Sequence, residues 1–322
     1  MAIIYIVALT KIQSVSIDKN GDVRVTKELM EKFSKTLPKN LQSIDKNFQQ
    51  IAKGEIDEVI DKKVNSIFKP VYKQIPNYSN FHYSVTGEYA EIGAALSGKL
   101  SESIKEKIFD KANFDSNFKE GMAEIIDSSN EILAHAMKNS KDDISKSLDI
   151  DDNEMNMLTN SFSEIVTKDM QDRFSNIIVD SLRISGMGAG VAGALVAKTV
   201  AKKAATKLAA KIAIKTTAKV AGGGGATAVG ATIGSAAGPV GAVIGGVVGG
   251  IVGWIAVDKI VVEVDQLINE EEFQQELTDL IDKQKEELKI NLSKMYAKSL
   301  KQTSQKLQND FKNTKLKDLM SE

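Results

Sequence analysis

Two glycine patterns in the sequence match loops that bind phosphate groups in nucleotide-binding proteins. Residues 188–193 read G-x-G-x-x-G, and residues 93–99 read G-x-x-x-x-G-K. A dinucleotide site also needs a preceding strand and an acidic residue about 20 positions further on, whereas here a helical pattern precedes and no acid follows before Asp258. The second pattern continues with Leu100, so the hydroxyl that would hold Mg²⁺ is missing. Both patterns are therefore interpreted as small residues that pack between helices.

Few other residues could take part in catalysis or bind a metal ion. His82 and His135 are the two histidines, and neither has a nucleophile or a set of metal ligands near it in sequence. We expect both at the surface or at a helix end. Residues 149–154 are acidic but lack the glycine and the final glutamate of a calcium loop, so they predict a helix cap. Cysteine is absent. The sequence predicts no enzyme, no cofactor and no metal site.

The most unusual stretch is Val220 to Val257, which carries no charged side chain and is rich in Gly, Ala, Val and Ile. Glycines recur mostly at spacings of four, so on a helix they form a face on which another helix can approach closely. The break at Gly238-Pro239 predicts two helical arms. The expected membrane or helix-packing residues are Gly230, Gly234, Gly238, Gly241, Gly245, Gly249, Gly253 and Trp254. Insertion into a membrane and burial inside a soluble bundle both remain open.

A basic segment precedes this stretch. Between Asp180 and Asp258 there is no acidic residue, but one arginine and seven lysines give a charge of +8, so the rest of the chain carries −9 for a net charge of −1. The lysines are Lys198, Lys202, Lys203, Lys207, Lys211, Lys215 and Lys219. Anionic lipid headgroups and acidic helices, of this chain or of a partner, are the two expected contacts. Nucleic acid is not expected, because no aromatic residues interleave for stacking on bases.

The rest of the chain reads as helix after a short apolar start. Residues 1–9 predict either the stub of an anchor or a buried strand, and residues 15–17 and 23–25 predict a β-hairpin around Asn20-Gly21. Apolar residues at spacings of three and four follow from Thr26, a predicted helix cap. Helices are expected over about 81–109 and 115–137, and an apolar stripe from Val264 to Phe311 predicts one long, coiled-coil-like helix.

We therefore predict an all-α protein, an elongated bundle of long amphipathic helices with a central Gly/Ala-rich hairpin and a small N-terminal β-hairpin. The expected divisions are residues 1–25 (apolar start and β-hairpin), 26–183 (helical domain), 184–257 (basic and glycine-rich hairpin) and 258–322 (long acidic helix packing on the bundle).

Three segments occur in an order that resembles a class of uncharacterised bacterial envelope proteins. They are the run Tyr83-Ser84-Val85-Thr86-Gly87-Glu88-Tyr89, the small-residue region 186–254, and residues 269–275 with the sequence NEEEFQQ. The resemblance implies a membrane-associated protein with an N-terminal anchor and brings no known activity. The order of long helices around an uncharged hairpin also looks like that of α-helical pore-forming toxins.

The sequence thus favours a non-enzymatic, membrane-associated structural or assembly protein at the bacterial inner membrane. The hairpin would serve membrane insertion or helix association. A pore-forming toxin and a soluble, cytoplasmic helical scaffold with a buried hairpin are the alternatives. The expected partner is an anionic membrane, with a second copy of the chain or an acidic helical protein as further candidates.

Overall fold

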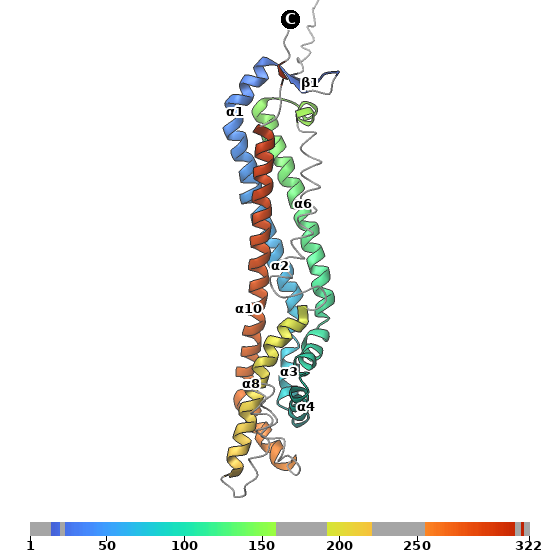
Figure 1. The fold of residues 1–322 in the computed structure, drawn as a ribbon, viewed down its shortest axis with the longest axis vertical. Coiled ribbons are helices and arrows are strands. Elements are labelled where there is room, and N and C mark those ends of the chain that lie inside the picture. The colour runs from blue at the N-terminus through green and yellow to red at the C-terminus, as the bar shows by residue number, and fades with distance from the viewer. Residues whose placement is uncertain (1–13, 20–22, 159–191, 221–254, 313–316, 319–322) are drawn as a thin grey trace, which may run out of the picture. The chain divides into compact units, whose positions relative to one another are not determined.

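The computed structural model describes residues 14–19, 23–158, 192–220, 255–312 and 317–318 (Figure 1). The predicted class, an all-α protein with a small N-terminal β-hairpin, is confirmed. The described residues form two compact units. Unit 1 draws on residues 1–60, 125–177 and 292–322, and unit 2 on residues 61–124 and 178–291.

Unit 1 begins with a three-stranded sheet. Strands β1 (Val15–Ile17) and β2 (Val23–Val25) are antiparallel, as predicted, and β3 (Lys317–Asp318) adds to β2 in parallel. Arg24 and Asp18 form an ion pair of 2.7 Å beside the connection between β1 and β2. Asn20-Gly21, the predicted turn, lies outside the described residues.

Three helical segments follow the sheet. Helix α1 (Lys27–Lys46) starts at Thr26, whose hydroxyl accepts a hydrogen bond from the Leu29 amide at 3.3 Å, which confirms the predicted cap. A π-helical segment, η1 (Asn47–Ala52), leads into α2 (Lys53–Tyr72). The core of unit 1 includes these residues, each with at most 1% of its surface exposed: Ile44, Phe48, Ile56, Ile60, Ile125, Leu292, Tyr296 and Leu300.

Helix α6 (Phe114–Leu148) runs further than the expected end near residue 137 and stops where Asp149 takes a positive φ of 57°. A reciprocal cap starts the next turn, because the Glu154 amide donates to Asp151 at 2.9 Å and the Asp151 amide donates to Glu154 at 3.1 Å. The Val15 amide donates to the same Glu154 carboxylate, so this cap also holds β1.

Unit 2 contains a series of short helices: α3 (Ile75–His82), α4 (Val85–Leu96), α5 (Leu100–Ile104) and the π-helical segment η2 (Lys105–Asp110). The prediction of one helix over 81–109 is therefore wrong. Ser84 caps α4 by accepting from the Gly87 amide at 2.9 Å, and Gly98, with φ of +72°, separates α4 from α5. Residues 93–99, the G-x-x-x-x-G-K pattern, thus form the last turn of α4 and its connection to α5.

Two more helices complete unit 2. They are α8 (Ala192–Val220) and the first part of α10 (Ile255–Lys312), a 58-residue helix that confirms the predicted long C-terminal helix. Edge-on aromatic contacts fill the interior elsewhere, with ring centroids 5.0 Å apart for Phe68 and Phe114 and 5.4 Å apart for Phe109 and Phe114. Of the glycine-rich hairpin predicted over residues 220–257, residues 221–254 lie outside the described residues.

Candidate functional site

Ion pairs between α8 and α10 in unit 2 show the relative direction of the two helices. Lys203 lies 2.7 Å from Glu276, and Lys207 lies 3.4 Å from Glu276 and 3.3 Å from Glu272. The residue number falls along α10 as it rises along α8, so the two helices are antiparallel (Figure 1, yellow and orange). In sequence, the uncharged residues 221–254 join the end of α8 to the start of α10. Helices α8 and α10 are the two arms of a helical hairpin.

The glutamate at the centre of these ion pairs is held in its charged form. Burial alone would raise the pKa of Glu276, but a hydrogen bond from Lys203 and the charges of Lys207 and Lys203 outweigh it and leave the pKa below its ordinary value. Glu276 is therefore ionised at neutral pH, and the attraction between the two arms is fully present there.

An aromatic side chain anchors α10 to the end of α3. Phe273 is fully buried, and its ring stacks on that of His82 with centroids 4.3 Å apart and planes 24° apart. The Tyr83 ring meets Phe273 edge-on at 5.8 Å, and the Tyr83 hydroxyl donates to the carbonyl oxygen of Asn269 at 3.1 Å. Two of the segments singled out in the sequence, residues 83–89 and 269–275, therefore meet at this anchor.

A buried polar cluster lies behind Phe273. Nδ1 of His82 is 2.6 Å from one oxygen of Glu91, and the Tyr78 hydroxyl donates to the other oxygen at 2.7 Å. All three side chains are about 1% exposed. Burial, together with the Glu91 charge, raises the pKa of Tyr78 well above its ordinary value, so this hydroxyl remains a donor. The cluster fixes the orientation of the His82 ring against which Phe273 stacks.

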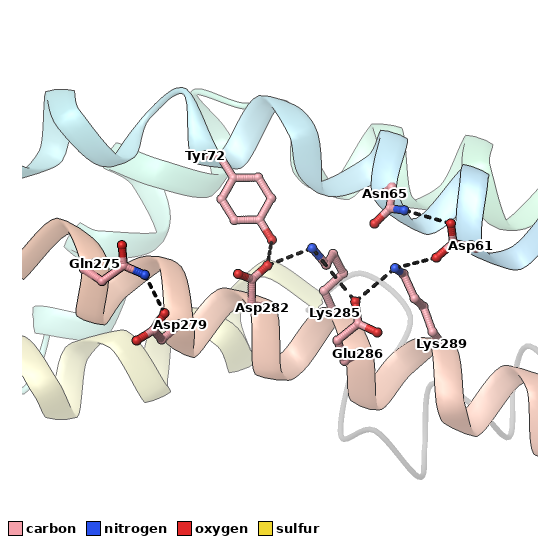
Figure 2. Close-up of polar contacts among 9 residues, drawn as sticks. All are labelled: Asp61, Asn65, Tyr72, Gln275, Asp279, Asp282, Lys285, Glu286 and Lys289. Atoms are coloured by element: carbon pink, nitrogen blue, oxygen red, sulfur yellow. Dashed lines mark hydrogen bonds and ion pairs between the residues drawn. The ribbon is translucent and has the colours of Figure 1, made fainter.

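A second set of polar contacts ties α10 to α2 further along unit 2, and Figure 2 shows it. Lys289 bridges Glu286, at 2.9 Å, and Asp61 of α2, at 2.8 Å. The hydroxyl of Tyr72 donates to Asp282 of α10 at 2.5 Å, and Lys285 lies 2.7 Å from the same carboxylate. Acidic and basic side chains alternate along this set of contacts, so a shift of α10 along α2 would bring like charges together. The contacts therefore favour a single register between α2 and α10.

The contacts in this network shift the pKa values of Asp61, Asp282 and Tyr72. A hydrogen bond from Lys289 and its charge lower the pKa of Asp61. Burial alone would raise the pKa of Asp282, but hydrogen bonds from Lys285 and Tyr72 outweigh it and lower the pKa. Burial and the hydrogen bond to Asp282 raise the pKa of Tyr72. Both carboxylates are thus charged at neutral pH, and Tyr72 is neutral.

Helix α8 also packs against α4, α5 and η2. Its fully buried residues are Val196, Ala197, Val200, Ala204 and Leu208, and Leu208 packs with Ile92 of α4. At the start of the helix, a Cβ on Gly193 would come within 3.0 Å of Phe109 Cβ, and the Gly193 amide donates to Asp115 at 3.2 Å. The last residue of the G-x-G-x-x-G pattern therefore serves close helix packing.

The predicted site residues are distributed unevenly over the described chain. Lys203 and Lys207 form the ion pairs with α10, while Lys198 and Lys202 are exposed on α8. Lys211, Lys215 and Lys219 belong to the same helix. The predicted glycines and Trp254 lie outside the described residues, as do residues 1–9.

Sequence reasoning missed the anchor. His82 lies at the last residue of α3, which is one of the two positions expected for it, but it is buried and not at the surface. His135 is exposed, as expected. An available signal was the spacing of His82 and Glu91, whose helices meet at the Ser84 cap. Phe273 carried no such signal, because it looked like any other member of the apolar stripe.

Comparison of the chain with protein-family models, with curated proteins and with solved structures finds no match. Among the described residues, no helix has the length and apolar character needed to cross a membrane. Within the same residues, no group of three or more His, Asp or Glu side chains is arranged to hold a metal ion.

Proposed function

We propose that the protein is a non-enzymatic, membrane-associated structural or assembly protein that brings its uncharged segment to a membrane on the helical hairpin of α8 and α10. The observation that carries this proposal is the antiparallel pairing of Lys203 and Lys207 with Glu276 and Glu272. Because α8 and α10 are antiparallel, the end of α8 and the start of α10 lie at the same end of the pair, and residues 221–254 connect them in sequence. A long uncharged connection of this kind is costly in water unless it is covered by protein or lipid.

The rest of the site supports a structural role for the hairpin. Phe273 anchors α10 on the end of α3, and the contacts of Asp61, Asp282 and Lys289 hold it on α2. The hairpin therefore starts from a rigid base. A lipid surface that binds the connection gains affinity when the base is preorganised, because less conformational entropy is lost on binding.

Vesicle flotation tests the proposal. The full chain should float with vesicles of phosphatidylglycerol and phosphatidylcholine. A variant in which residues 221–254 are replaced by a Gly/Ser segment of equal length should stay at the bottom of the gradient. Circular dichroism should show that the α8 and α10 helices are retained in this variant. Equal flotation of the two proteins would contradict the role of the uncharged segment.

A second candidate, an α-helical pore-forming protein, is favoured by the buried face of α10 in unit 1. Ser299 and Thr303 are 5% and 3% exposed, and their hydroxyls have no hydrogen-bond partner among the described residues. Hydroxyls buried without partners reduce the stability of that packing, so α10 would leave it at a lower cost. Vesicles loaded with a fluorescent dye separate the candidates, since the proposed structural role predicts binding without release and a pore predicts release.

A further inference from the structure

The first four lysines of α8, Lys198, Lys202, Lys203 and Lys207, lie in two rows on different faces of the helix. At 3.6 residues per turn, Lys202 lies about 40° from Lys198, and Lys207 lies about 40° from Lys203. The two pairs are separated by about 140° around the helix axis. We call Lys198 and Lys202 the outer row and Lys203 and Lys207 the inner row.

The inner row is occupied by the partner arm. Lys203 and Lys207 reach Glu276 at 2.7 and 3.4 Å, and Lys207 also reaches Glu272 at 3.3 Å. The Lys207 side chain is 23% exposed and that of Glu276 is 24% exposed. These charges face each other across the hairpin, so an outside ligand would have to displace a carboxylate to reach them.

The outer row has different surroundings. Lys198 and Lys202 are exposed, and the buried residues Val196, Val200 and Ala204 lie on the far side of the helix wheel. The sequence holds no acidic residue between Asp180 and Asp258, so no acid of α8 itself offsets these charges. The positive potential of the outer row is therefore directed to solvent, on the arm that leads into the uncharged segment.

We propose that the two rows have different partners: the inner row closes the hairpin on α10, and the outer row binds the phosphate groups of an anionic phospholipid surface. This inference rests on the proposed function, since it assigns the membrane contact of the hairpin to particular side chains. The outer row fits a membrane because exposed lysines attract the phosphates of anionic lipids, and α8 continues from these lysines toward an uncharged segment that fits an acyl layer.

Two double variants with the same change in net charge test the assignment. Lys198→Gln with Lys202→Gln removes the outer row, and Lys203→Gln with Lys207→Gln removes the inner row. Partitioning onto vesicles of phosphatidylglycerol and phosphatidylcholine and thermal unfolding are measured for both. We expect the outer-row variant to partition about tenfold more weakly with an unchanged unfolding midpoint. The inner-row variant should unfold at a lower temperature and partition within about twofold of the wild type.

A further variant guards against unfolding of the inner-row protein at the assay temperature. Glu272→Gln with Glu276→Gln breaks the same ion pairs and leaves every lysine in place, so it should lower the unfolding midpoint without weakening partitioning. Equal weakening by the two lysine variants would overturn the inference and indicate general charge attraction. No effect of the outer-row variant would also overturn it. Failure of the wild type to bind these vesicles would instead contradict the proposed function itself.

Discussion

Gly87 occupies a position in α4 where the chain has no room for a side chain. A Cβ built there would lie 1.7 Å from the carbonyl oxygen of Phe81, and that oxygen also accepts a hydrogen bond from the Ser84 hydroxyl at 2.8 Å. The obstacle is backbone, so it cannot move aside as a flexible side chain would. The corner between α3 and α4, which orients His82 and Tyr83 toward Phe273, depends on this close approach.

We expect Gly87→Ala to lower the free energy of unfolding by at least about 2 kcal/mol, as other overpacked sites do. Urea denaturation followed by circular dichroism measures the change. Gly93→Ala is the matched control in the same helix, because nothing lies within 4 Å of its added Cβ, and it should stabilise α4 by up to about 1 kcal/mol. Equal stability of the two variants would show that the corner relaxes around the added methyl group.

At the scale of the helices, the hairpin should respond to acid through its carboxylates. Glu276 and Asp282 have pKa values in the folded protein below their ordinary values of 4.5 and 3.8. The unfolded chain therefore binds more protons in acid than the folded chain does. Their contribution to stability is complete above the ordinary pKa values and is lost as the pH falls through the lowered ones.

The unfolding midpoint should therefore change little from pH 7 to pH 5 on account of these two groups, and it should fall below about pH 4.5. Glu276→Gln should make that fall shallower, since it removes one of the groups that must be protonated. Glu271→Gln, an exposed neighbour on α10, should leave the fall as it is. Thermal unfolding at a series of pH values measures this. A wild-type slope in Glu276→Gln would mean that the pairs with Lys203 and Lys207 add no stability.

Local patterns were sufficient to predict the long helices but not the corners between them. The apolar stripe of α10 and the hydroxyl cap at Thr26 are features of neighbouring residues, and the structure has both. The break at Ser84 also had a local cause, a serine three residues before a glycine, but the apolar period continued across it and outweighed the cap. Phe273 belongs to the predicted apolar stripe, whereas its stacking on His82 depends on chain segments far apart in sequence.

The partners of the seven lysines could likewise be predicted only in part from the sequence. Their spacing of four indicated a drift around the helix, and it left lipid and acidic helices as equal candidates for all seven. The position of Glu272 and Glu276 beside α8 separates Lys203 and Lys207 from the others. That position depends on the register of α10 against α8, which no pattern within α8 encodes.

At the scale of the whole molecule, the division into units does not follow the sequence. Unit 1 is assembled from three separate stretches, and α2, α6 and α10 each supply residues to both units. Composition distinguished the basic and uncharged residues 184–257 from the rest. It carried no information on which helices pack together, because amphipathic helices of similar composition follow one another along the chain.

A chain ending at residue 291 should lose unit 1 and keep the anchor of unit 2. It would lack Leu292, Tyr296 and Leu300, all fully buried, and each such loss opens a cavity worth several kcal/mol. Hydrogen exchange should become fast in residues 29–60 and 125–148 and stay slow in residues 75–96. A chain ending at residue 312 is the control. Slow exchange throughout the shorter chain would show that residues 292–312 do not complete the core of unit 1.

The three-part assembly of unit 1 also affects the order in which the protein can form on the ribosome. Its first two stretches, with apolar residues such as Phe48 and Leu133, emerge long before Leu292, which they bury on folding. At about 5–20 residues per second, the intervening residues take several seconds to be made. The uncharged segment emerges within that interval, before α10 exists to pair with α8. Nascent chains therefore expose two separate apolar stretches at once, until the residues of α10 that cover the first of them have been made.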